Sequence, residues 1–200
     1  MNPLTKRIYL EAGIVLCLLA MTASAQTRDI RKIDFTNFIY QPAYCSRMFA
    51  KDGMPRSVAV KGGEFKTEQV YLDVSKDDLL YGDLTGDGVE KAIVPVTCGN
   101  IGANDYLTEV MVFGWIGAKP SLLGTLDNGR LERDYARYHP KTILWPLLKV
   151  AAVEDRTLVI KGAADGPHCC PRYDVAFRYR WNGRGFVLIG RPARTLRPQT

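Results

Sequence analysis

Apolar and polar residues alternate along much of the chain after residue 57, and this period of two is typical of β-strands with one buried face. Val70, Leu72 and Val74 show the pattern clearly, while residues 107–116 become apolar on both faces, which predicts a central strand. Pro146 should interrupt pairing or mark an edge, because proline has no N–H to donate to a neighbouring strand. The predicted strands cover residues 57–60, 65–74, 90–98, 107–116, 121–126, 142–153, 157–161, 173–181 and 186–189.

The last predicted hairpin has two chemically different faces. Its aromatic face, which we expect in the core, alternates with a polar face that carries arginines. Asn182 to Gly185 predict a tight turn, because Asn-Gly tolerates positive φ. The alternating sets are Tyr173, Val175, Phe177, Tyr179 and Trp181 on one face and Asp174, Ala176, Arg178 and Arg180 on the other.

Helical signals are few. Residues 36–48 hint at a helix that Pro42 keeps short, and residues 130–138 predict either a short surface helix or a long loop. Residues 127–129 are expected to form a turn that closes the preceding strand. No repeat of 20–50 residues is present, which argues against a propeller or solenoid. The sequence therefore predicts a mainly β protein, an antiparallel meander or sandwich-like single domain with one or two short helices, with an α+β arrangement as the alternative.

The first 25 residues have the pattern of a signal peptide. Lys6 and Arg7 precede an apolar stretch at 12–21, and the small residues at 23–25 predict cleavage after Ala25. No other segment approaches the length needed to span a membrane. We therefore expect an exported protein, periplasmic or extracellular, with one domain at 26–191 and a mobile basic tail at 192–200. An uncleaved anchor is the alternative.

Positive charge is concentrated near the C-terminus. The chain has a formal net charge of +6, and residues 171–200 contain seven arginines and one aspartate. Arg178, Arg180 and Arg184 are a candidate binding patch for an anionic envelope component or an acidic protein. An exported protein seldom meets nucleic acid, so nucleic acid is not an expected partner. A solvated surface without a partner is the alternative interpretation.

Four cysteines follow the predicted cleavage site, and an even number in an exported chain suggests two disulfides. A bond between the neighbours Cys169 and Cys170 requires a strained eight-membered ring, which disfavours that pair and with it Cys45–Cys98. We expect Cys45 to bond with one of the two neighbours and Cys98 with the other, in an order that the sequence leaves open. A zinc site with His168 is the alternative, and it lacks the usual C-x2-C spacing.

The stretch from Asp83 to Gly88 has the spacing of a calcium loop. The EF-hand pattern fails because its twelfth position, which requires a glutamate, is Val94. The stretch also resembles the shorter loop of VCBS and FG-GAP propeller repeats, although the ninth position is Lys91 where that loop has an acid. A turn in which Asp and Thr side chains cap backbone amides explains the same residues. The candidate calcium ligands are Asp83, Thr85, Asp87, the Val89 carbonyl and Glu90.

Several short motifs occur together in one order. A segment at 34–40 precedes Cys45, the stretch at 81–88 precedes a strand ending in Cys98, and Cys169-Cys170-Pro171 precedes Tyr-x-Trp at 179–181. In this order the chain is similar to the LppP/LprE type of small exported bacterial proteins, many of them lipoproteins. The resemblance implies an architecture and an envelope location, and it brings no catalytic residues. Leu16 before Cys17 departs from the lipoprotein signal, so a lipid anchor is not expected.

No recognised catalytic motif accompanies the two histidines, His139 and His168. The nearest case of two carboxylates that could act together in acid–base chemistry is Asp83 with Asp87. The sequence therefore favours a non-enzymatic binding or envelope-associated module. The loops at 99–106 and 130–140 are candidate contact loops. A calcium-stabilised structural or adhesion module is the second hypothesis, and a hydrolase of unknown class is the third.

Overall fold

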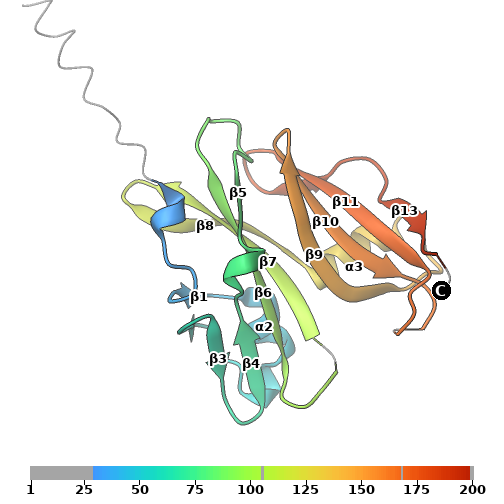
Figure 1. Cartoon of the computed structure of the whole chain (residues 1–200), viewed down its shortest axis with the longest axis horizontal. Helices are drawn as coiled ribbons and strands as arrows, with labels where there is room; N and C mark the ends of the chain where they lie inside the picture. Colours follow the sequence, from blue (N-terminus) through green and yellow to red (C-terminus); the bar gives the residue numbers. More distant parts are fainter. Residues whose placement is uncertain (1–28, 105, 168, 199–200) are drawn as a thin grey trace, which may run out of the picture.

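The computed structural model describes residues 29–104, 106–167 and 169–198, so the predicted signal peptide lies outside the described residues. Two antiparallel sheets form most of the molecule, and Figure 1 shows them side by side, the first in green and yellow and the second in orange and red. The N-terminal sheet has the strand order β3-β4-β6-β7-β8, with β5 also paired to β6. Its strands are β3 (Glu64–Lys66), β4 (Val70–Asp73), β5 (Leu80–Gly82), β6 (Lys91–Asn100), β7 (Tyr106–Ile116) and β8 (Lys119–Asp127).

The C-terminal sheet has the order β12-β11-β10-β9, with β13 paired to β11. The strand that contains Pro146 is β9, which ends the sheet as the proline predicts. The strands of this sheet are β9 (Leu144–Glu154), β10 (Thr157–Ala164), β11 (Tyr173–Trp181), β12 (Phe186–Leu188) and β13 (Ala193–Leu196). The smaller elements are β1 (Ile39–Tyr40), β2 (Val58–Ala59), α2 (Ala43–Met48), α3 (Asn128–Ala136), η1 (Ile30–Lys32), η2 (Ala50–Asp52) and η3 (Lys76–Asp78).

The predicted mainly β fold with short helices is confirmed. β6 and β7 are central, because alternate residues of each strand enter two different cores. In β7, Val110 and Val112 belong to the core between the two sheets, and Met111 and Phe113 belong to the core under the N-terminal segment. All four side chains are at most 4% exposed. The prediction of a strand with two buried faces is therefore confirmed.

Four local predictions differ from the structure. Residues 65–74 form the hairpin β3–β4 instead of one strand, because the Thr67 hydroxyl accepts the N–H groups of Gln69 and Val70 and turns the chain. Asp127 does not close a turn. It caps α3 by accepting the Arg130 N–H at 2.8 Å.

α3 is also more buried than a surface helix. Leu131 and Tyr135 lie one turn apart on the same face of the helix and are 0% and 1% exposed in the core between the sheets. The few apolar residues of this segment are therefore enough to anchor it, because they share one face.

The tail predicted to be mobile is the fourth difference, since it forms β13 on the edge of β11. β12 covers only the end of β11, at 179–181, so the first half of that edge is open. Residues 193–196 fill it by pairing with 173–176. Unpaired strand edges are costly, which explains why a sequence rich in Arg and Pro still becomes a strand.

Candidate functional site

The disulfide joins Cys45 and Cys98, so the predicted pairing with Cys169 and Cys170 is wrong. Cys45 lies in α2, and Cys98 lies on the face of β6 that this helix covers; the two Cα atoms are 6.0 Å apart. Both side chains are completely buried. The prediction from sequence disfavoured the Cys45–Cys98 bond because it assumed that all four cysteines are bonded. In the structure Cys169 and Cys170 are free and exposed.

A buried acid orients the helix that carries this bond. Glu109 of β7 is 1% exposed and accepts the N–H groups of Tyr44 and Cys45, at 3.0 and 3.3 Å, in the first turn of α2. Burial, with a smaller contribution from the charge of Asp127, raises the pKa of Glu109 to about 7. The sequence signal was a single charge in the alternating apolar row of residues 107–115, which sequence reasoning did not use.

In the candidate calcium loop, Asp83 binds the backbone. Its carboxylate accepts the N–H groups of Thr85, Gly86 and Gly88 at 3.1, 2.6 and 2.9 Å. Burial opposes ionisation, but the Gly88 and Gly86 amides outweigh it and lower the pKa of Asp83. Gly86 and Gly88 adopt φ values of 79° and 75°, which are open to glycine. The loop therefore folds as a capped turn.

The ammonium group of Lys91 lies beside two of the other predicted ligands. Its Nζ donates to the Asp87 carboxylate at 2.8 and 3.0 Å and to the Val89 carbonyl at 2.7 Å. Lys91 is 4% exposed. Burial of the Asp87 carboxylate alone would raise its pKa, but the hydrogen bond from Lys91 helps lower that pKa to about 2. Glu90 is directed elsewhere, where it binds Arg31 through two bonds of 2.6 and 2.8 Å. A dication at this loop would have to displace the lysine.

Two of the three patch arginines lie on one open face of the C-terminal sheet. In the sheet register Arg178 is opposite Val159, Arg180 is opposite Thr157, and Lys161 is opposite Lys149. Residues paired across antiparallel strands point to the same side of the sheet. Four exposed cations from three adjacent strands therefore share this side, which we call the basic face: Lys149, Lys161, Arg178 and Arg180.

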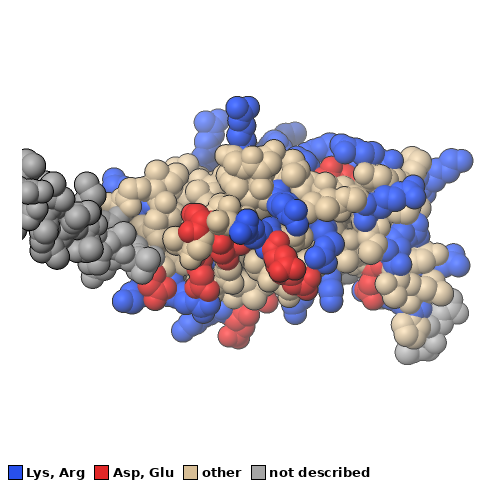
Figure 2. All heavy atoms as spheres, turned by 90° about the horizontal axis from the view of Figure 1, so that it is seen from above, with Lys and Arg blue, Asp and Glu red and all other residues tan. Residues whose placement is uncertain are grey.

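The contacts of the basic face leave its charges accessible. Arg178 is paired with Glu154 at 3.2 Å, and the two side chains are 50% and 54% exposed, so an anion in solution can compete for this arginine. Arg184 lies outside the face, in the turn after β11, where its N–H binds the Asn182 side chain. In Figure 2, lysine and arginine atoms are dense over the half of the molecule where Figure 1 places the C-terminal sheet.

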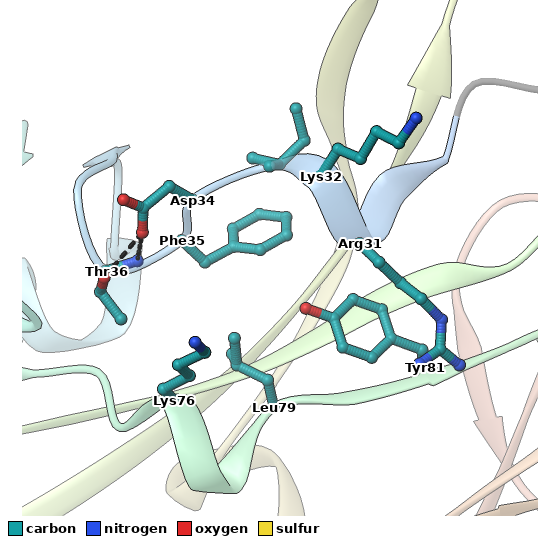
Figure 3. Close-up of a pocket in the computed structure, with 9 residues that line it drawn as sticks. Arg31, Lys32, Asp34, Phe35, Thr36, Lys76, Leu79 and Tyr81 are labelled. Atoms are coloured by element: carbon teal, nitrogen blue, oxygen red, sulfur yellow. Dashed lines mark hydrogen bonds between the residues drawn. The ribbon is translucent and has the colours of Figure 1, made fainter.

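A groove of about 380 Å³ lies between η1 and η3, and Figure 3 shows it. Its Arg31 is already bound to Glu90 and lies 4.7 Å from the ring centre of Tyr81. Burial raises the pKa of the Tyr81 hydroxyl, which Figure 3 shows directed into the groove. Lys32 and Lys76 extend from opposite walls. The groove has the size of a small-ligand site, and its lining carries both signs of charge, since the Asp34 carboxylate belongs to it together with the lysines.

Of the two histidines, His168 lies outside the described residues. The His139 ring packs against Tyr135 with the ring centres 4.8 Å apart and the planes tilted by 37°, and its Nδ1 lies 3.2 Å from the Arg194 guanidinium. Burial and the charges of Arg194 and Arg191 lower the pKa of His139. Arg194 is in turn paired with Asp165 at 2.7 Å, so the described contacts give His139 a packing role.

The two candidate contact loops are more regular than predicted, since 99–100 continue β6 and 130–136 belong to α3. Within the described ranges, no group of three or more His, Cys, Asp or Glu side chains is arranged to hold a metal ion. No described helix is both long and apolar enough to cross a bilayer. Comparison with protein-family models, curated proteins and solved structures finds no match for this chain.

Proposed function

We propose that this protein is a non-enzymatic binding module of the cell envelope that holds an anionic partner on its basic face. In this proposal the chain is exported and loses residues 1–25, in line with its similarity to the LppP/LprE type of proteins. The partner is an extended polyanion with repeated carboxylate or phosphate groups, such as an acidic envelope polymer or an anionic lipid surface.

One observation carries the proposal, namely the alignment of four exposed cations on the open side of three adjacent strands. Neighbouring strands are about 4.8 Å apart, so the cations form a flat two-dimensional array instead of a single point charge. A flat array suits a polymer or a membrane surface, which presents several anions at once.

The types of residue support the same partner class. Arg178 and Arg180 carry planar guanidinium groups, which bind carboxylate or phosphate oxygens through two parallel hydrogen bonds. They are directly opposite Val159 and Thr157, which are 6% and 2% exposed although they are on the solvent side of the sheet. Long cationic side chains can cover such neighbours with their aliphatic stems while the charged ends remain in water.

The test is binding to two immobilised polyanions, polygalacturonate and phosphatidylglycerol vesicles, with phosphatidylcholine vesicles as the neutral reference. We expect binding that weakens as salt increases, and a loss of at least about tenfold in Arg178→Glu/Arg180→Glu, because each cation near an anionic surface contributes about 1 kcal/mol. The control Lys51→Glu/Lys61→Glu changes net charge equally at exposed positions of the N-terminal half and should retain binding.

The two variants distinguish a site from a general charge effect. Equal losses in both variants would assign the binding to net charge alone and overturn the proposal. An absence of binding to both polyanions at low salt would overturn it as well. The export part has its own test, the intact mass of the protein recovered from the producing cells, which should begin at Gln26 and carry no lipid.

A further inference from the structure

The exposed neighbours Cys169 and Cys170 have no other cysteine available to them among the described residues. Their Sγ atoms are 2.8 Å apart. Cys45 and Cys98 are bonded to each other and completely buried. The nearest partner for either exposed thiol is therefore the other one.

The surrounding backbone holds the two thiols in a defined turn. Cys170 N–H donates to the Pro167 carbonyl at 2.9 Å, and Arg172 N–H donates to the Asp165 carbonyl at 2.8 Å. Gly166 adopts φ 75°, and a Cβ at that position would lie 2.8 Å from the Cys170 carbonyl oxygen. The turn therefore depends on glycine and fixes the backbone around the pair.

The thiols also line a groove that suits a small anionic reactant. The groove has a volume of about 850 Å³, and its lining contains both cysteines together with Arg172 and Arg197. Disulfide exchange proceeds through a thiolate, and the hydrogen bond with the Cys169 thiol raises the pKa of Cys170. The two arginines favour reactants that carry carboxylates, as low-molecular-weight disulfides of the glutathione class do.

We propose that Cys169 and Cys170 form a reversible redox site that closes to a vicinal disulfide. One Cys thiolate attacks a sulfur of a low-molecular-weight disulfide, which forms a mixed disulfide and releases one small thiol. The second Cys thiolate then attacks the protein sulfur of that bond, which forms the Cys169–Cys170 bond and releases the second small thiol. Two cysteines are oxidised, and one small disulfide is reduced to two thiols.

The same geometry makes the bond reversible. Adjacent residues have Cα atoms about 3.8 Å apart, which is below the usual range for disulfides, and a strained disulfide is more easily reduced. The strain that disfavours this pair as a permanent bond is therefore suited to a pair that opens and closes. This site does not depend on the proposed polyanion binding.

The test follows one tryptic peptide of the full-length protein. Residues 162–172 lie between cleavage sites at Lys161 and Arg172 and contain both cysteines and no other. The protein is equilibrated in glutathione buffers from reducing to oxidising, quenched with acid, alkylated and digested. We expect this peptide to lose both alkylatable thiols together and to become lighter by two hydrogen atoms, and dithiothreitol to reverse the change.

Matched measurements make the result decisive. The peptides that contain Cys45 and Cys98 should remain linked to each other throughout. Cys170→Ser should accumulate a glutathione adduct at Cys169, because no neighbouring thiol remains to expel it. Persistent double alkylation in the most oxidising buffer, stable glutathione adducts on the unmodified sequence, or a link from 162–172 to Cys45 or Cys98 would each overturn the proposal.

Discussion

The N-terminal sheet buries both faces of its central strands, whereas the C-terminal sheet buries one face and leaves the other to solvent. The disulfide also lies in the N-terminal half, between α2 and β6. In the C-terminal half, the described ion pairs Arg178–Glu154, Arg194–Asp165 and Arg197–Asp174 lie on or near the surface. One half is thus fixed by a covalent bond inside a core, and the other by strand pairing with charges around it.

The charges follow the same division. Residues 29–140 contain thirteen lysines and arginines and sixteen acidic residues, whereas residues 141–198 contain eleven and four. The excess of cations therefore belongs to the half whose sheet has an open face. The net charge of the whole chain therefore conceals a strongly basic region in its C-terminal half. Four measurements test this division between the two halves.

Loss of the disulfide should have the largest effect. Cys45 and Cys98 are 53 residues apart, and closing a loop of that length is worth about 4 kcal/mol in the chain-entropy model. We expect Cys45→Ala/Cys98→Ala to lower the free energy of unfolding by about this amount, as measured by urea denaturation. Cys169→Ser/Cys170→Ser is the control and should be close to the original protein. Equal free energies of unfolding for all three proteins would show that the Cys45–Cys98 disulfide does not stabilise the N-terminal half.

Neutralising Glu109 should have the next largest effect, and its sign depends on pH. The pKa of Glu109 is about 7 in the folded protein against 4.5 for the free side chain, so the folded state holds the proton more tightly than the unfolded state. Its contribution to stability is full below pH 4.5 and is lost as the pH rises through 7. The advantage of Glu109→Gln should therefore grow by about 3 kcal/mol between about pH 4 and about pH 9.

Exposed Glu64 offers the matched control, since Glu64→Gln should shift stability little at any pH. Urea denaturation across the pH range measures both variants. A constant difference between Glu109→Gln and the original protein would contradict the raised pKa.

The hydrogen bond between Tyr179 of β11 and Asp134 of α3 should contribute less to the free energy of unfolding. Tyr179 of β11 donates its hydroxyl to the buried Asp134 carboxylate at 2.9 Å, and Arg130 donates to the same oxygen at 2.7 Å. We expect Tyr179→Phe to lower stability by about 2 kcal/mol, because a buried carboxylate loses one of its donors. In the control Tyr138→Phe, the ring keeps its contact with Arg191. Equal decreases in melting temperature for Tyr179→Phe and Tyr138→Phe would show that the hydrogen bond to Asp134 does not stabilise the fold.

The smallest effect is expected from calcium. Lys91 donates to both oxygens of the Asp87 carboxylate and to the Val89 carbonyl, so its ammonium group occupies two of the groups that a bound ion would need as ligands. The melting temperature should therefore be the same in millimolar calcium and in chelator. An increase with calcium would restore the calcium-stabilised module, since a ligand that binds only the native state must raise its stability.

Periodicity made the sheets predictable, because strands with one or two buried faces repeat at period two. The boundaries of β11 at Tyr173 and Trp181 match the predicted range, and the burial of β7 on both faces was readable from its composition. What the sequence did not provide was pairing between distant segments. The disulfide and β13 both depend on which strand edge or core position is free after the other strands have assembled.

The basic face was predictable only in part for the same reason. The period of β11 places Arg178 and Arg180 on one side, but Lys161 joins them only through the register of β10 with β11, and Lys149 only through the register of β9 with β10. That register contains two irregularities, between Val159 and Ile160 and between Lys161 and Ala163. A β-bulge shifts which residues face outward, so no period along a single strand reveals the array.

The pairing of β13 with β11 has a practical consequence for anyone who produces this protein. Removing residues 193–196 would leave unpaired those backbone N–H and C=O groups of Tyr173 to Ala176 that face β13, while the opposite edge of β11 stays paired with β10. An unpaired strand edge pairs readily with strands of other molecules, so proteins shortened in this way should precipitate or form intermolecular β-structure during expression. An affinity tag belongs beyond Pro198, with a spacer long enough to keep that final strand seated.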